Sequence, residues 1–169
     1  LMPMLNQNAK KDLIDFYKSD MKPILPNEWS ANSKLVRVEN NFIELSEDSE
    51  GIVTTSMAML ELKNRDTLLC MVRTIKTPQP DSEIFFFSKN WAPLKTQKYI
   101  TIPTIDNFKK ELDNTLVDYT QLTLQPQQGG TFSLEVTLDA TDGQTDANAD
   151  RTKHIVYRWN GAKFIKQQQ

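Results

Sequence analysis

The chain has 169 residues with 20 basic and 22 acidic side chains, and its formal net charge is −2. Hydrophobic residues make up 38% and charged residues 25%, which is the composition of a folded globular protein and excludes a disordered chain. A balanced charge creates no field that attracts nucleic acid, and no apolar run approaches the roughly 18 residues of a membrane span. We therefore expect no nucleic-acid partner and no transmembrane segment.

An amphipathic helix is predicted near the N-terminus, over residues 8–21, with Asn8 as its N-cap. Leu13 and Tyr17 lie one turn apart on the same helix face, as apolar residues do when a helix packs against a core. Pro23 bars the helix from continuing, so an extended or turning connection is expected after it.

Short antiparallel strands are predicted to follow this connection. Residues 67–75 form the most apolar stretch, and the turn at 63–66 joins it to the strand before it. Residues 131–138 alternate most strictly between apolar and polar, which is typical of a strand with one buried face. The predicted strands are 34–38, 41–46, 57–62, 67–75, 121–124 and 131–138.

Two hairpins rich in aromatic residues are predicted at 82–94 and 153–165. The first contains three consecutive phenylalanines centred on Phe86 and then Trp91. The second turns at an Asn-Gly pair ending in Gly161, the strongest short hairpin signal because both turn positions need positive φ. Alternation puts Phe86 on the face opposite its two neighbours. Either both faces of this strand are covered, or Phe86 is exposed and forms part of a contact patch.

The order of the predicted elements repeats along the chain. A second helix is expected after Pro103, with Thr104 as its N-cap, and each half runs helix, strand, hairpin, long loop and a hairpin with a tryptophan. We predict one compact domain over residues 1–169, made of pseudo-repeats at about 6–99 and 100–169. The expected fold class is α+β, with two tandem helix-plus-antiparallel-sheet repeats that can share one sheet.

Two stretches carry a resemblance to a known family. They are the helical segment at 12–17, Asp-Leu-Ile-Asp-Phe-Tyr, and the segment at 81–94, which opens with Asp-Ser, continues with aromatic residues and closes with Trp-x-Pro-Leu. With these motifs the chain resembles a family of uncharacterised exported proteins of gut and oral Bacteroidetes.

The resemblance implies tandem repeats similar to the β-lactamase-inhibitor-protein architecture. It also implies export to the periplasm, or display at the outer membrane as a lipoprotein with a lipid anchor upstream of Leu1. It brings no substrate, cofactor or partner. The first residue, Leu1, is not an initiator methionine, which is what removal of a signal peptide would leave.

The acidic loop at 139–150 holds four carboxylates and Gly143, a composition that suggests a calcium site. If Gly143 is the turn glycine, however, the expected oxygen-ligand positions fall on Leu138 and Ala140, and the bidentate acid position falls on Ala149. A solvated polar loop is therefore expected, and no metal site.

Other candidate chemistry lacks partners in the sequence. His154 is the only histidine and Cys70 the only cysteine, so a two-histidine metal site cannot form, and the sequence shows no partners for a histidine-based triad. We expect His154 at the surface, Cys70 in the core, and the acidic run at 44–50 on a solvated turn. We predict no catalytic, cofactor-binding or metal-binding residue.

The function expected from the sequence is that of a non-enzymatic exported protein that binds an unidentified protein partner by shape and apolar burial. The alternative is a small-ligand or glycan-binding module, in which tryptophans stack on a ligand in a concave sheet. Aromatic residues also fill cores, so each candidate has that second interpretation. The candidate interaction patch consists of Trp29, Phe86, Trp91 and Trp159.

Overall fold

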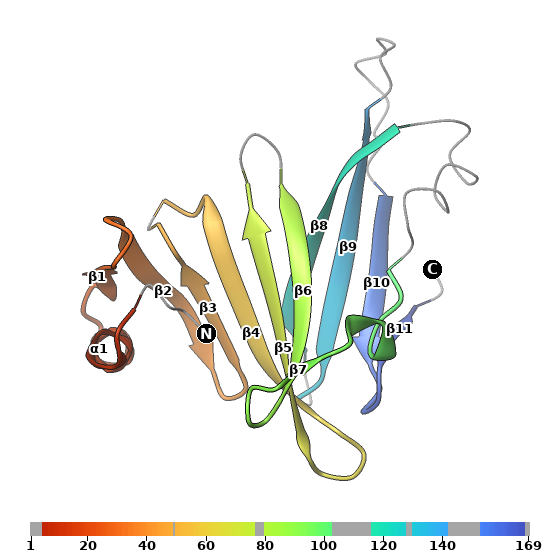
Figure 1. Ribbon diagram of the computed structural model, residues 1–169, viewed down its shortest axis with the longest axis horizontal. Coiled ribbons are helices and arrows are strands. Elements are labelled where there is room, and N and C mark those ends of the chain that lie inside the picture. Colours follow the sequence, from red (N-terminus) through yellow and green to blue (C-terminus); the bar gives the residue numbers. More distant parts are fainter. Residues whose placement is uncertain are drawn as a thin grey trace.

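The computed structural model describes residues 5–48, 50–76, 80–102, 116–127, 130–141 and 153–167. These residues form an α-helix, a short 3₁₀ helix and two sets of antiparallel strands (Figure 1). The helical elements are α1 (Gln7–Lys18) and η1 (Thr96–Lys98). The strands are β1 (Ile24–Pro26), β2 (Asn32–Glu39), β3 (Phe42–Ser46), β4 (Val53–Glu61), β5 (Thr67–Ile75), β6 (Asp81–Ser88), β7 (Pro93–Leu94), β8 (Leu116–Pro126), β9 (Phe132–Thr141), β10 (Lys153–Trp159) and β11 (Phe164–Lys166).

The helix forms where the apolar pattern predicts it, but its start lies earlier. The side chain of Asn6 accepts a hydrogen bond from the backbone N–H of Ala9 at 2.9 Å, so Asn6 is the N-cap. The prediction that Asn8 caps the helix was wrong, because Asn8 already lies in the first turn. Leu13 is the buried residue of this helix. Just after the end of the helix, Asp20 adopts a positive φ of 55°.

The strands pair in chain order and form two separate sheets. The large sheet runs β1 to β7, and the small sheet has the order β11-β10-β9-β8. Within the large sheet, most neighbouring strands are joined by short turns, so the hairpin signals of the sequence decide much of the topology. The predicted strand at 67–75 has the bounds of β5. Strand β1 was not predicted, because a proline such as Pro26 argues against a strand. It is tolerated here because β1 lies at the edge of its sheet.

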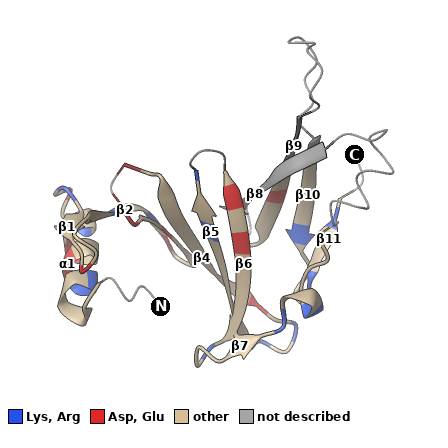
Figure 2. Ribbon diagram, turned by 45° about the horizontal axis from the view of Figure 1, so that its top comes forward, with Lys and Arg blue, Asp and Glu red and all other residues tan. Residues whose placement is uncertain are grey.

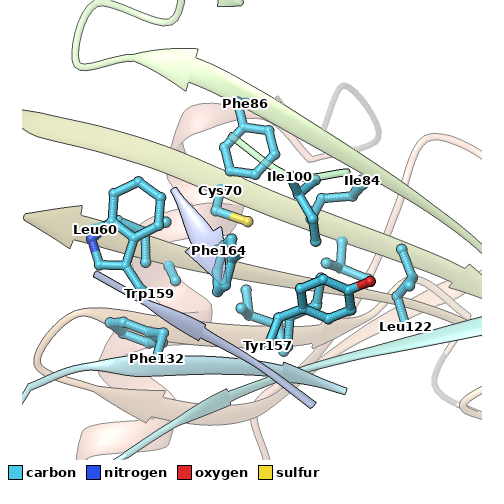
Figure 3. Close-up of a cluster of buried hydrophobic side chains, with 14 of the residues drawn as sticks. Leu60, Cys70, Ile84, Phe86, Ile100, Leu122, Phe132, Tyr157, Trp159 and Phe164 are labelled. Atoms are coloured by element: carbon cyan, nitrogen blue, oxygen red, sulfur yellow. The ribbon is translucent and has the colours of Figure 1, made fainter. Parts of the chain in front are cut away.

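The inner face of the large sheet packs against the small sheet. Cross-strand neighbours Phe42, Ala58, Cys70 and Phe86 form one row of this face, and all are at most 4% exposed. Strand β8 crosses close to β4, β5 and β6. The small sheet contributes the other wall of the core, as Figure 3 shows. Its buried side chains are Leu122, Leu124, Phe132, Leu134, Val136, Ile155, Tyr157, Trp159 and Phe164.

The two sheets are also fastened at one end. The indole N–H of Trp159 donates to the carbonyl of Glu61 at 2.8 Å, and the backbone N–H of Lys63 donates to the carbonyl of Gly161 at 2.9 Å. Gly161 has a φ of +84°, and a Cβ on it would lie 3.0 Å from Cγ of Lys63. The Asn-Gly turn therefore serves both the hairpin and its contact with the β4–β5 turn.

Within the described residues, the outer face of the large sheet is covered only at one end. Leu5 and Leu13 pack against Leu35 and Leu45, which places α1 over β2 and β3. Figures 1 and 2 show α1 beside β1 and β2, at the opposite end of the large sheet from β6 and β7. Among the described residues, no helix lies over the outer face of β5 and β6.

The mostly antiparallel sheet with one described helix is consistent with the predicted α+β class. The second predicted helix, after Pro103, lies outside the described residues, so the two-repeat arrangement stays a prediction. The described strands of the two halves do not share hydrogen bonds in one sheet. No helix in the described part of the chain is long and apolar enough to cross a membrane.

Candidate functional site

An apolar groove of about 250 Å³ lies on the outer face of the large sheet. Its floor is built by cross-strand pairs from adjacent strands, Met57 opposite Met71 and Met59 opposite Leu69. Ile43 continues the same face on β3, because it pairs with Met57. Register thus places side chains from three strands on one surface.

Three of these floor residues are methionines, and Met59 is 44% exposed. Met side chains have flexible thioethers that adapt to differently shaped apolar partners, and such surfaces recur where one protein binds several others. The only carboxylate among the described lining residues is Glu39, which forms an ion pair with Arg37. The groove therefore offers apolar contact rather than acid–base chemistry.

Trp91 stands at the border of this groove and is 48% exposed. It adopts a φ of +64°, in the left-handed region that favours glycine. Its N–H donates to the carbonyl of Ser88 at 2.8 Å, and the Ser88 hydroxyl accepts from the N–H groups of Asn90 and Ala92 at 3.3 and 3.2 Å. The indole ring lies 5.9 Å from the ring of Phe87.

A non-glycine residue in this conformation costs about 1–2 kcal/mol of backbone free energy. The turn keeps the largest side chain at a position where glycine would fit without strain, and about half of that side chain stays in water. Strained residues of this kind cluster at binding and catalytic sites. Trp91 is thus the most distinctive residue of the groove.

A family model described as a protein of unknown function, DUF3256, matches residues 1–164. The chain belongs to the DUF3256 family. Its fold is similar to a domain of an uncharacterised protein from Porphyromonas gingivalis W83, with a TM-score of 0.73 and 18% sequence identity over 99% of this chain and 92% of that one. No curated protein matches the chain.

The four tryptophan and phenylalanine residues predicted to form one patch in this DUF3256 protein do not come together. Phe86 is 1% exposed and Trp159 is 6% exposed, and both lie in the core between the sheets (Figure 3). An exposed role for these two residues is therefore excluded, because the small sheet covers that face. Trp29 is 54% exposed in the turn between β1 and β2 and does not line the groove, whereas Trp91 does.

The sequence did not identify the outward-facing residues of β4, β5 and β6 as candidates. Because Phe86 faces inward, Phe85 and Phe87 face outward, on the same side as Met57 and Met71. The signal was the alternation of β5, in which Leu69 and Met71 oppose Cys70. Both faces of β5 are apolar, which is unusual for a strand with one solvated side.

The prediction that the acidic run at 44–50 lies on a solvated turn was wrong for Glu47, although Glu50 is exposed. Glu47 is 5% exposed, and both of its carboxylate oxygens accept hydrogen bonds from the Arg73 guanidinium at 3.0 Å. The hydroxyl of Thr55 donates to the same carboxylate at 2.6 Å. Burial opposes the charged form of Asp48, but hydrogen bonds from the N–H of Val53 and the Ser46 hydroxyl outweigh it and hold the pKa of Asp48 below its usual value.

The remaining candidates are Cys70, His154 and the polar loop at 139–150. Cys70 is fully buried, as predicted, and burial raises the pKa of its thiol. His154 is exposed, also as predicted, and its Nδ1 lies 2.6 Å from a carboxylate oxygen of Glu135. The predicted polar loop after β9 lies outside the described residues, and the described residues contain no group of side chains suited to a metal ion.

Proposed function

We propose that this DUF3256 protein is an exported, non-enzymatic protein that binds a protein partner through the apolar groove of the large sheet. The observation that carries the proposal is Trp91, which is strained, half exposed and directed to a groove of methionine and leucine side chains. Export rests on the resemblance described from the motifs at 12–17 and 81–94.

The partner that fits this groove presents a short row of apolar side chains. Binding hot spots are enriched in tryptophan, and flexible methionines beside it can adjust to the partner's shape. The polar rim at Asn40 and Asn41 can hydrogen-bond to the partner's backbone. Binding would thus derive from apolar burial, with the rim setting orientation.

The alternative of a glycan-binding groove is less well supported. A sugar needs hydrogen-bonding groups spread around the ring as well as an aromatic platform. The polar side chains of the described groove belong to three consecutive residues, Glu39, Asn40 and Asn41, and its floor is thioether and aliphatic.

The test compares two tryptophan variants with the wild-type chain. Trp91→Ala removes the groove residue, and Trp29→Ala is the matched control, since Trp29 is also about half exposed and also lies in a turn. The wild type and both variants are used to recover partners from the native host. The recovered partner is then titrated with each of the three proteins.

We expect one partner to bind the wild type and Trp29→Ala alike, and Trp91→Ala to bind it at least about thirtyfold more weakly, which corresponds to the 2 kcal/mol of a hot spot. Equal affinity of a folded Trp91→Ala variant would refute the role of the groove.

A further inference from the structure

A second pocket, independent of the apolar groove, lies between η1 and β11. It encloses about 420 Å³ and is bordered by three lysines, Lys98 on η1 and Lys163 and Lys166 on the β10–β11 hairpin. None of its described lining residues is acidic. Figure 2 shows basic positions on both η1 and β11, at the far end of the molecule from α1.

The three lysines have no anionic partner within the described part of the chain. The described ion pairs involve Arg37, Arg73, Lys89 and His154, and none of these borders the pocket. The chain as a whole is slightly acidic, with a net charge of −2, so three unpaired cations around one cavity are a local exception. Like charges held together repel each other, and an anion placed between them relieves that repulsion.

The inner wall of the pocket is apolar and firmly held. Ile100, Tyr157 and Phe164 contribute to it, and each is at most 4% exposed. The N–H of Phe164 donates to the carbonyl of Tyr99 at 2.7 Å, and the hydroxyl of Tyr157 donates to the carbonyl of Thr101 at 3.3 Å. These bonds fix the segment after η1 against the small sheet, so the pocket is formed without a ligand.

We propose that this pocket binds a small organic anion with an apolar body and a carboxylate or phosphate head. The apolar body would lie against Ile165 and the exposed edges of the wall residues, and the head would face the lysines, whose ammonium groups act as point charges toward either anion. A volume of about 420 Å³ lies within the usual range for small-molecule pockets, roughly 300–1,000 Å³. The lysines are exposed, so binding weakens as salt screens them.

The experiment titrates the whole protein with four probes and follows backbone amide resonances. Phenylacetate and phenyl phosphate carry both parts of the ligand, phenylacetamide lacks the charge, and inorganic phosphate lacks the apolar body. Thr101 and Lys166 report on the pocket, and Met59 and Leu69 report on the groove. The two anions with an aromatic body should shift the pocket resonances saturably, and the better of the two identifies the preferred head.

Two triple variants with the same net charge supply the control. Lys98→Gln, Lys163→Gln and Lys166→Gln together should weaken binding of the better anion at least tenfold. Lys11→Gln, Lys18→Gln and Lys22→Gln, which change exposed lysines in or just after α1, should change it less than twofold. If the first triple variant does not fold, Lys98→Gln and Lys166→Gln alone should each weaken binding severalfold.

Several results would overturn the proposal. They are pocket resonances that no probe shifts saturably, phenylacetamide binding as tightly as phenylacetate, and equal weakening in the two triple variants. Binding of inorganic phosphate as tight as that of phenyl phosphate would show only a general attraction of anions and would overturn it as well.

Discussion

Phe86 and Trp91 belong to one hairpin, and the structure predicts opposite results when each is truncated to alanine. The ring of Phe86 is 1% exposed and packs against Tyr99 and Phe164, with ring centroids 4.9 and 6.4 Å apart. Truncating a buried phenylalanine costs about 3–5 kcal/mol, because apolar contact is lost and a cavity remains. Trp91 is half exposed and has a strained backbone, so Trp91→Ala should cost less than about 1 kcal/mol.

The assay is chemical denaturation of the wild type, Phe86→Ala and Trp91→Ala, followed by thermal melting. Total stabilities of about 5–15 kcal/mol are usual, so Phe86→Ala should lose a large part of the folding free energy. For a domain of 169 residues, 1 kcal/mol shifts Tm by roughly 2–4 °C, so the melting temperature of Phe86→Ala should fall by about 6–20 °C. Equal losses in the two variants would refute the assignment of Phe86 to the core and Trp91 to the surface.

Two further predictions concern the loop after β3. Glu47→Ala should destabilise the fold by about 3 kcal/mol or somewhat less, because it leaves the partly solvated Arg73 without its carboxylate partner. Glu50→Ala, at an exposed position, should be nearly neutral. Equal denaturation midpoints for the two variants would contradict this. Asp48 has a folded-state pKa below its ordinary value of 3.8, so its stabilising contribution is present above that pH and is lost as the pH falls through the folded pKa. Asp48→Asn should therefore be less stable than the wild type at neutral pH, with the difference shrinking in acid; a difference that does not change with pH would contradict the sign.

Much of the fold could be predicted because local signals decide it. The alternation at 67–75 and the Asn-Gly turn at Gly161 each specify a strand or a hairpin without tertiary information. Local signals do not decide which face of a strand is buried when both faces are apolar. The run of Phe85, Phe86 and Phe87 is compatible with burial of either face. The packing of β8 across the inner face makes that choice, and β8 is far from β6 in the sequence.

The candidate site could be predicted only in part for the same reason. Trp91 follows a strong turn signal and lies at the surface, but Met57 and Met71 became candidates only through cross-strand register. The Glu47–Arg73 pair joins residues 26 positions apart, and an acidic turn gives no local indication that one of its carboxylates is buried. Long-range pairing, rather than composition, determines both features.

The most direct test of the groove is photo-crosslinking from its floor. A photoreactive residue at Met59 samples the groove, and one at Thr123 samples the outer face of the small sheet, which carries polar side chains such as Glu135 and His154. Both proteins are exposed to light in the native host and the adducts are identified by mass. We expect a single protein adduct from Met59 that Trp91→Ala abolishes, and none of the same mass from Thr123. The same adduct from both positions, or one that survives Trp91→Ala, would contradict the assignment of the binding surface.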